Sequence, residues 1–575
     1  MPKVLQKIPF IIELFFNGLF ILLYSLKETN RLPAAWDIKI LDTAMQFCAY
    51  LVPVVVLISV VTNFILCKRI ELFLRKYIFS VLIIIPLMMT WGDVEFAFWL
   101  VSAHLLSLIL SLYDVDTLDK VKNSFSFKSF MQVLRLKPAQ LVILSFMAVI
   151  FIGTFVLMLP PSLVEGKTLS FSDALFMATS ATCVTGLSTM SLQQDFTLFG
   201  QMVILLLIQV GGLGIMTLST SMTILLGRSM RMKDRIIMQD LLDVSSLEDL
   251  FAMIINIIQY TFLIELWGAI VLTFAFIFEG YEFGTSIYYG FFHSISAFCN
   301  AGFSLFDNSL ESYATSPLIH GTISVLVILG GLGFIVLKEV SEMVMSGGKI
   351  VRMALHSKIV ITTSIILTVG GALFIFFGEF LNALDGYTLV EKLQVAFFQS
   401  VTLRTAGFNT IPLTSFNSYT LYGMSLIMFI GASPGSTGGG VKTTTLAILI
   451  QSIKSTFKGV KTVTILDRTV PSPIVVRATA LTFISIIITS VFILLLMKLE
   501  PSQTFLPIFF EVVSASGTVG LSLGVTSQPS IAGKGAISLL MLIGRIGPLT
   551  LLLAIGGRDR STGKIDYPDG RIMIG

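Results

Sequence analysis

Long apolar segments alternate with short polar stretches along this 575-residue chain. After residue 135, apolar helices are predicted to start near residues 138, 198, 251, 319, 357, 420, 475 and 536. Before residue 135, four further candidate spans lie near residues 8–26, 41–67, 78–92 and 95–113, the third being short enough to be partly re-entrant. A run of roughly 20 apolar residues crosses the hydrocarbon of a membrane. The pattern therefore predicts an all-α membrane protein.

The eight later helices form four pairs, and each pair encloses a short amphipathic piece and a polar loop. The loops read SATCVTGLS, SAFCNAGFS, VTLRTAGFN and SASGTVGLS, with central glycines Gly186, Gly302, Gly407 and Gly520. A phenylalanine lies ten residues before each glycine (Phe176, Phe292, Phe397 and Phe510), and a second glycine follows it by 24 to 28 residues (Gly211, Gly330, Gly431 and Gly544). Four copies in one phase predict an internal repeat of helix, short helix, loop and helix.

Composition and charge agree with a membrane protein. Hydrophobic residues make up 55% of the chain and charged residues 13%, whereas a soluble domain has about 25% charged residues. Lys and Arg gather at residues 120–137, 228–235, 338–358 and 454–477 and in the C-terminal tail. The positive-inside rule therefore places both termini in the cytoplasm and the four glycine loops on the outer side. Lys27, Arg31 and Lys39, on the first outer loop, are a mild exception.

The short pieces before the loops cannot span a membrane, so we expect them to enter it and return. Non-helical backbone at that depth survives only where protein or a watery cavity satisfies it. A single Gly-rich loop is usually an ordinary turn, but four in phase favour a pore. Four such loops around one axis form a ring of carbonyls that can replace the hydration shell of a cation, and the C-terminal ends of the short helices favour positive charge there.

The expected fold is thus four helix–pore loop–helix repeats around one pore, plus about four extra N-terminal transmembrane helices. The boundaries follow the polar stretches: N-terminal membrane helices of unknown role at residues 1–134, then pore repeats at 135–230, 231–350, 351–460 and 461–575, the last including a cytoplasmic tail.

The predicted ion-binding residues act mainly through their backbone carbonyls. They are Val184, Thr185, Gly186, Asn300, Ala301, Gly302, Thr405, Ala406, Gly407, Thr518, Val519 and Gly520. Asn300 offers a side-chain oxygen as well, although a structural hydrogen bond is an equal alternative. Arg404 would repel a cation, so we expect its side chain to lie behind the filter and brace the loop.

The chain carries no pattern typical of an enzyme. His104, His293, His320 and His356 lie far apart in sequence, and no nucleophile constellation accompanies them. The four cysteines are scattered without metal-ligand spacing. We therefore expect no catalytic residue, no covalent cofactor and no metal other than the transported cation.

The third repeat departs from the others after Gly431, where its second helix runs through GASPGSTGGGVKTTT. Pro434 and five glycines cannot hold a continuous helix. A phosphate-binding loop is not expected, because Val441 separates Gly440 from Lys442 and no strand precedes the segment. We therefore predict a flexible segment at mid-membrane, just below the loops.

Two charged residues are expected inside the membrane. Arg545 aligns with small residues of the other repeats (Gly212, Gly331 and Ala432), and a buried Arg needs a partner. Carbonyls of the broken segment at the same depth are the expected partners. For Glu265 a paired structural carboxylate and a role in the ion path both stay open.

Several of these stretches resemble the Trk/Ktr/HKT superfamily of potassium transporters, and above all its KtrB-type membrane subunit. They are ATCVTGL, AFCNAGF, RTAGFNT, SASGTVGLS, RLKPAQ, DALF, FTLFGQ, QVGGLGI and GASPGSTGGGVKTTT. The resemblance covers residues 135–575, and the N-terminal region departs from it. It implies potassium uptake across the cell (inner) membrane through a channel-like pore, with potassium favoured over sodium by the glycine at position 186.

The resemblance also implies a gate and partners. The intramembrane gate would comprise Gly435, Gly438, Gly439, Gly440, Lys442 and Arg545. A homodimer with one pore per subunit and a cytosolic ring of nucleotide-binding regulatory subunits are implied, and no nucleic acid. The alternative is an inverted-repeat secondary cation carrier, although the repeats of carriers come in pairs.

Overall fold

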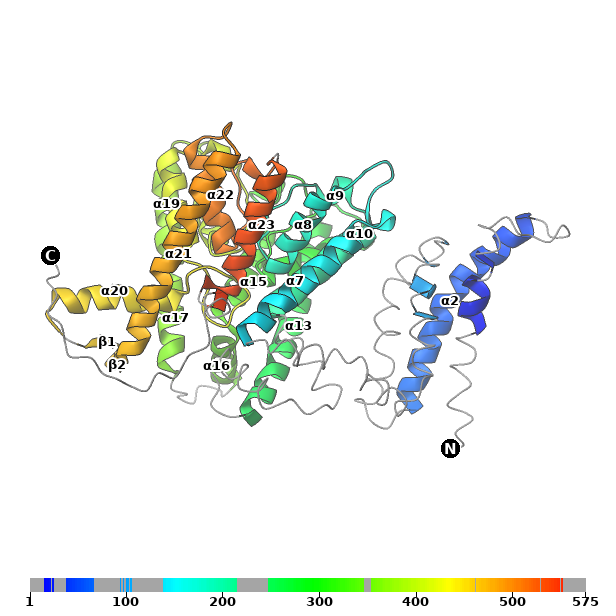
Figure 1. Cartoon of the computed structure of the whole chain (residues 1–575), viewed down its shortest axis with the longest axis horizontal. Helices are drawn as coiled ribbons and strands as arrows, with labels where there is room; N and C mark the ends of the chain where they lie inside the picture. The colour runs from blue at the N-terminus through cyan, green and yellow to red at the C-terminus, as the bar shows by residue number, and fades with distance from the viewer. Residues whose placement is uncertain are drawn as a thin grey trace.

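The computed structural model describes residues 15–21, 23–24, 38–66, 138–214, 247–345, 353–460, 462–527, 529–548 and 550–551, with scattered positions between 94 and 105. The described chain is mainly helical (Figure 1). Its strands, β1 (Val463–Ile465) and β2 (Arg468–Val470), form a short antiparallel hairpin. The predicted all-α class is confirmed.

Each of the four sequence repeats folds as a helix, a short helix, a loop and a second helix. Repeat 1 contains α7 (Pro138–Leu157), α8 (Phe171–Cys183), the short α9 (Leu192–Asp195) and α10 (Leu198–Leu213); repeat 2 contains α13 (Leu247–Phe278), α14 (Phe283–Phe298), α15 (Pro317–Leu332) and α16 (Phe334–Met345). Repeat 3 contains α17 (Leu355–Glu379), α18 (Leu389–Thr402), α19 (Ser418–Phe429) and α20 (Thr443–Phe457); repeat 4 contains α21 (Ser472–Leu499), α22 (Phe505–Gly517) and α23 (Ile531–Ile546). Every predicted helix start lies within five residues of the observed one.

Side-chain caps mark where several helices begin, including the short helices α8 and α18. Ser170 caps α8 because its side chain accepts a hydrogen bond from the backbone N–H of Asp173. Ser530 caps α23 by accepting one from the backbone N–H of Gly533. Thr388 and Glu391 form a reciprocal capping box at the start of α18. These side chains satisfy N–H groups that the first turn of a helix leaves free, so the helices begin at defined residues.

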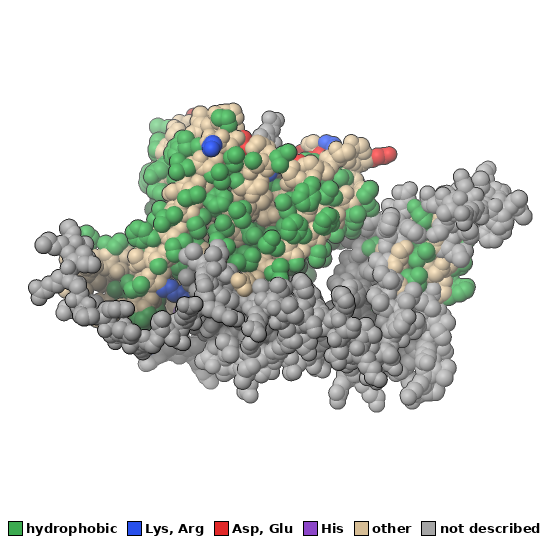
Figure 2. Space-filling view, viewed as in Figure 1, with side chains coloured by type: hydrophobic (Ala, Val, Ile, Leu, Met, Phe, Trp, Pro, Cys, Tyr) green, Lys and Arg blue, Asp and Glu red, His purple; other side chains and the backbone are tan. Residues whose placement is uncertain are grey.

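Four described helices are long and apolar enough to cross a membrane, namely α13, α17, α21 and the N-terminal α2 (Ile38–Leu66). The pair α15 and α16, bent by 109°, would make a fifth span. Large apolar side chains also point outward, including Phe483 and Leu494 of α21, which are 63% and 69% exposed. Figure 2 shows hydrophobic side chains over much of the visible face of the repeats. Such a surface suits lipid and not water.

The predicted N-terminal spans are only partly described. The span at 41–67 is confirmed as α2, which Figure 1 shows outside the bundle of repeats. Described positions within 8–26 and 95–113 are helical, and the span at 78–92 lies outside the described residues. The basic stretches at 120–137 and 228–235 and the C-terminal tail also lie outside them.

The buried core lies mainly where neighbouring repeats meet. One cluster joins α8 and α10 to α22 and α23, a second joins α13, α14 and α15 to α18, and a third joins α18 and α19 to α22. The short helices take part in all three clusters. The repeats therefore pack around the short helices and position the loops that follow them.

Candidate functional site

The four glycine loops meet in a closed ring, which we call the glycine ring (Gly186, Gly302, Gly407 and Gly520). A Cβ atom added to each glycine would lie 2.1 to 2.6 Å from a carbonyl oxygen of the next loop: Gly186 from Ala301, Gly302 from Ala406, Gly407 from Val519, and Gly520 from Thr185. Any side chain would collide with backbone at these distances. The ring is closed because the fourth loop returns to the first.

The backbone of each loop has the same alternating conformation. Each ring glycine has a positive φ, between 68° and 97°, and so does the residue two positions before it. Those residues are Val184, Asn300, Thr405 and Thr518, with φ from 53° to 68°. A left-handed conformation is costly for β-branched residues, and it persists only where surrounding structure imposes it. The loops are therefore held by their surroundings rather than by local preference.

Serine side chains at the end of the short helices hold three of the loops. Ser180 and Ser514 accept hydrogen bonds from the ring glycines six residues later, both at 3.1 Å. Ser296 donates to the carbonyl of Phe303 at 2.7 Å. The third loop has Val401 at this position, and it is held by Asn409, whose side chain donates to Glu311 of repeat 2 at 2.7 Å.

The phenylalanines that mark the repeats anchor the short helices in the core. Phe176, Phe292 and Phe510 are fully buried. Phe397 is 40% exposed, and its neighbour Phe398 is buried in its place. The buried phenylalanine therefore occupies the same position in three repeats and is shifted by one residue in the third.

Asn300 and Arg404, which the sequence singled out, are both buried. In the orientation that satisfies its amide, Asn300 donates to the carbonyls of Ala297 and Val327 at 3.0 and 3.2 Å. These contacts are the structural hydrogen bonds expected as one alternative. No described group accepts a hydrogen bond from Nε or Nη2 of Arg404, and the brace expected from this side chain stays a prediction.

The second glycine of each repeat explains how the second helices pass close beneath the ring. A Cβ on Gly211 or Gly330 would lie 2.0 Å from the carbonyl oxygen of Thr182 or Phe298, and one on Gly544 would lie 2.3 Å from that of Ser516. In repeat 3 a Cβ on Gly431 would instead meet Gly439 at 2.0 Å. The place under the third loop is thus taken by the chain that follows Gly431.

Residues 430–442, which we call the broken segment, connect α19 to α20 without forming a helix. The N–H of Gly439 donates to Thr518 Oγ1 of the fourth loop at 2.9 Å. A Cβ on Gly438 would lie 2.1 Å from Thr405 Oγ1 of the third loop. Thr437 Oγ1 donates to the Gly330 carbonyl of repeat 2 at 3.1 Å. The segment therefore lies directly beneath the glycine ring and touches three repeats.

Two cationic side chains hold the broken segment. Arg545 donates from Nη1 to the carbonyl of Thr437 and from Nη2 to that of Gly211, so the expected contact between Arg545 and the segment is confirmed. Lys442 Nζ donates to the carbonyls of Gly438 and Gly439 at 2.8 and 3.3 Å. The sequence predicted carbonyls of the broken segment as partners without naming Thr437, and it did not predict the contact with Gly211.

Glu265 lies away from the ring, in the layer between α13, α10 and α14. Its Oε2 accepts from Gln209 Nε2 at 3.1 Å, and the Cys299 thiol lies 3.8 Å from Oε1. The carboxyl is buried and hydrogen-bonded. This arrangement matches the structural alternative for Glu265.

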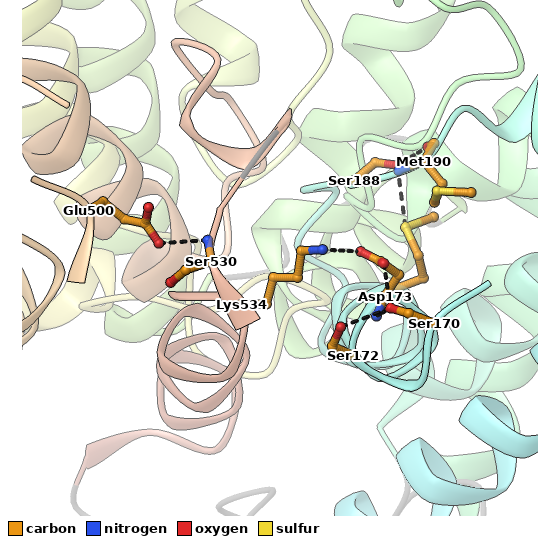
Figure 3. Close-up of polar contacts among 9 residues, drawn as sticks. Ser170, Ser172, Asp173, Ser188, Met190, Glu500, Ser530 and Lys534 are labelled. Carbon is orange, nitrogen blue, oxygen red and sulfur yellow. Dashed lines mark hydrogen bonds and ion pairs between the residues drawn. The ribbon is translucent and has the colours of Figure 1, made fainter. Parts of the chain in front are cut away.

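Polar contacts join neighbouring repeats at the outer ends of the helices. Lys534 of α23 forms an ion pair of 2.7 Å with Asp173 of α8, and Figure 3 shows the two side chains pointing toward each other. Burial by itself would raise the pKa of Asp173, but hydrogen bonds from Lys534 and Ser170 hold that pKa below its ordinary value. Repeats 1 and 2 are joined by Gln194, whose Nε2 lies 2.5 Å from Asp307.

Comparison with known proteins places this geometry in a family. The TrkH family model, described as "Cation transport protein", matches residues 122–559. The Ktr system potassium uptake protein B of Bacillus subtilis (strain 168) is 38% identical over 447 residues, which cover 77% of this chain and 97% of that protein. The potassium/sodium uptake protein NtpJ of Enterococcus hirae is 36% identical over 450 residues, covering 77% and 98%.

A solved structure supports the same fold. The crystal structure of the potassium transporter TrkH from Vibrio parahaemolyticus matches with a TM-score of 0.57 at 19% sequence identity, over 88% of this chain and 98% of that chain. The resemblance to Trk/Ktr transporters is confirmed, and the relatives are named as transporters and not as enzymes. The chain belongs to the TrkH family of cation transport proteins.

Proposed function

We propose that this protein takes up potassium through a channel-like pore whose selectivity filter is the glycine ring. The observation that carries the proposal is the closure of that ring, in which carbonyls of four loops lie beside one another. Such carbonyls can replace the hydration shell of a cation. The names of the relatives, which are potassium or potassium/sodium uptake proteins, support potassium as the substrate.

The four short helices add a favourable field at the filter. They end at Cys183, Phe298, Thr402 and Gly517, each within five residues of its ring glycine. The C-terminal end of a helix carries partial negative charge from carbonyls without intrahelical partners. Four such ends around one site stabilise a cation there and disfavour an anion.

The broken segment is the proposed gate. It lies beneath the ring, and it is held by hydrogen bonds from Arg545 and Lys442. A cation that leaves the filter toward the inner side meets this segment and two like charges, so conduction requires the segment to move. The gate residues are Gly435, Gly438, Gly439, Gly440, Lys442 and Arg545.

The proposed assembly follows the resemblance. We place the protein in the cell (inner) membrane with both termini in the cytoplasm, as a homodimer with one pore per subunit. A cytosolic ring of nucleotide-binding subunits binds the inner face and acts on the gate. The basic inner stretches, such as residues 454–477, support an inner contact with a soluble partner.

Two measurements test the proposed function. Expression in a host that lacks potassium uptake should restore growth at low potassium, and the purified protein in liposomes should pass potassium down its gradient. Flux that requires countertransport of a second ion would favour the carrier alternative. Sodium flux without potassium flux would overturn the proposed substrate.

A further inference from the structure

A second contact behind the loops recurs at one spacing in three repeats. It joins the residue nine positions before a ring glycine, on the short helix, to the serine two positions after that glycine. The pairs are Met177 with Ser188 at 3.3 Å, His293 with Ser304 at 3.1 Å, and Glu511 with Ser522 at 2.7 Å. The three short-helix residues are fully buried. We call the pairs His293–Ser304 and Glu511–Ser522 the hydroxyl clamps.

The chemistry of the second repeat determines which atom accepts. His293 Nδ1 lies 2.8 Å from the carbonyl oxygen of Tyr289, which can only accept, so Nδ1 carries the proton. Nε2 is then an acceptor. It accepts hydrogen bonds from the Ser304 hydroxyl at 3.1 Å and from the N–H of Leu305 at 3.4 Å. Nε2 of His293 thus accepts hydrogen bonds from both residues that follow Phe303 along the chain, Ser304 and Leu305.

The fourth repeat uses a carboxyl group for the same purpose. Glu511 Oε2 accepts from Ser522, and Oε1 accepts from Thr526 in the 3-10 turn that follows (Val525–Ser527). In both clamps the serine oxygen also accepts a backbone N–H two residues on, from Phe306 or Gly524, each at 3.0 Å. The serine therefore connects the short helix to the loop segment that follows the ring glycine.

In the other two repeats the hydrogen bond at this position is weaker or absent. In repeat 1 the acceptor is a thioether, which is weak, and the Ser188 hydroxyl contacts both Met177 Sδ and the carbonyl of Met190. Figure 3 shows Ser188 beside Met190. In repeat 3 the short-helix position holds Phe398, which cannot accept. The Phe398 ring stacks on His320 with centroids 4.8 Å apart. Repeat 3 is thus a natural example of the position without a clamp.

We propose that His293 and Glu511 are specificity-determining positioning residues for the filter, an inference that rests on the proposed function. A carbonyl that replaces hydration water must be held within about 0.5 Å of its place by the groups behind it. The ring glycines have no side chains, and the residue after each is apolar, so the first side chain that forms a hydrogen bond is the residue two positions on. Through that anchor, each clamp sets how far the carbonyls at positions 301–302 and 519–520 stand from the ion.

The test uses full-length protein in liposomes and measures the ratio of potassium to sodium flux per folded molecule. His293→Phe keeps a ring that already fits this position in repeat 3 but removes the acceptor, and Glu511→Leu keeps the volume. Loss of one hydrogen bond costs about 1 kcal/mol, so we expect each variant to lower the flux ratio about three- to tenfold. Glu511→Gln retains an acceptor oxygen and should restore the ratio to within about twofold of wild type.

Partner and control variants separate positioning from stability. Ser304→Ala should lower the ratio as His293→Phe does, and the double variant should be no worse than the more severe single variant, because contacting residues are not additive. Phe398→Leu, at the same position of the repeat without a clamp, should reduce the amount of folded protein and leave the ratio unchanged. A change in folded protein alone for the clamp variants would overturn the proposal.

Gly186→Ser distinguishes failure of the clamps from failure of the filter. If it changes the flux ratio while His293→Phe and Glu511→Leu do not, the filter stands and the clamps are refuted. If it leaves the ratio unchanged, the filter itself fails, and the clamps fail with it. Should the two clamp variants not fold, Ser304→Ala and Ser522→Ala still decide the question, because each removes only a hydroxyl.

Discussion

At the scale of single residues, the proposed filter requires four positions without a Cβ atom. Each ring glycine leaves room for a neighbouring carbonyl that any Cβ would displace. Val184 and Thr518 accept an unfavourable left-handed conformation at the ends of their short helices. Packing and the hydrogen bonds that Ser180 and Ser514 accept from Gly186 and Gly520 offset that cost.

The first prediction concerns Gly186. In Gly186→Ser the new Cβ would lie 2.5 Å from the carbonyl oxygen of Ala301 at a φ of 97°, so the first and second loops must move apart. We expect the preference for potassium over sodium to fall by about tenfold, measured as a flux ratio. Gly166→Ser is the matched control, since Gly166 also has a positive φ but no atom within 4 Å of its Cβ position. An unchanged ratio in folded Gly186→Ser would contradict the proposed filter.

The second prediction concerns Arg545. Arg545→Ala removes two charge-assisted hydrogen bonds, to Thr437 and Gly211, each typically worth about 1.5–3 kcal/mol. If they hold the broken segment closed, potassium uptake per folded molecule should rise at least about threefold. Arg477→Ala on α21 changes an exposed arginine and should leave uptake unchanged. A loss of folded protein with flat uptake per molecule would show that Arg545 only supports the fold.

At the scale of elements, the second helices of the repeats differ in one functional respect. The helices α10 and α23 run without a break past their second glycines, whereas α19 ends at Phe429 and α20 begins at Thr443. The broken segment between them takes its hydrogen bonds from three repeats. Such a segment can move as a unit when a few side-chain contacts are lost.

Shortening the broken segment tests its role as the gate. Deletion of residues 435–440 removes the contacts with Thr518, Thr405 and Gly330, and the shorter chain cannot fill the space beneath the ring. We expect potassium uptake to rise and to depend less on the regulatory partner. Uptake would be measured with and without that partner and normalised to folded protein. Uptake that stays flat or falls would show that the segment is not the gate.

The ion pair between α23 and α8 should make stability depend on pH. Because the folded protein holds the pKa of Asp173 below its ordinary value, the pair stabilises the fold at neutral pH, and this contribution is lost as pH falls through the lowered pKa. Asp173→Asn should therefore lower the unfolding temperature at pH 7 and have a smaller effect at pH 3. The exposed Asp385→Asn serves as the control. Equal effects of Asp173→Asn at both pH values would contradict this origin.

At the scale of the whole molecule, four similar units surround one axis and are joined at their outer ends by different contacts. Repeats 4 and 1 share the Lys534–Asp173 pair, repeats 1 and 2 share Gln194 and Asp307, and repeats 2 and 3 share Asn409 and Glu311. Core clusters also join neighbouring repeats, including repeats 3 and 4. The ring is thus stabilised between repeats as well as within them.

The last prediction concerns the assembly. The C-terminal sequence DYPDGRIMIG resembles that of KtrB-type subunits, so we expect the tail to contribute to binding of the nucleotide-binding ring. Removal of residues 561–575 should reduce co-purification of that partner, while the membrane subunit itself is recovered in equal amount. Equal recovery of the partner would exclude the tail from the interface.

The sequence by itself determined the repeat, the helix starts and the members of the glycine ring. Periodic apolar segments and glycines in one phase are local properties, so they can be recognised without coordinates. The contact of Arg545 with the broken segment also followed, because equal offsets from the ring glycines imply equal depth. The burial of Phe398 in place of Phe397 did not follow from the sequence, because it depends on how the third short helix packs.

Only the tertiary structure decided how the loops face one another and what holds them. The order in which each glycine meets the next carbonyl, the position of Gly431 against Gly439, and the partners Thr437 and Gly211 all join distant segments. Likewise, the spacing of Glu511 and Ser522 is visible in the sequence, but their hydrogen bond depends on the fold of the loop between them. Contacts across repeats depend on how four packed units close around an axis, and no local pattern in one repeat specifies them.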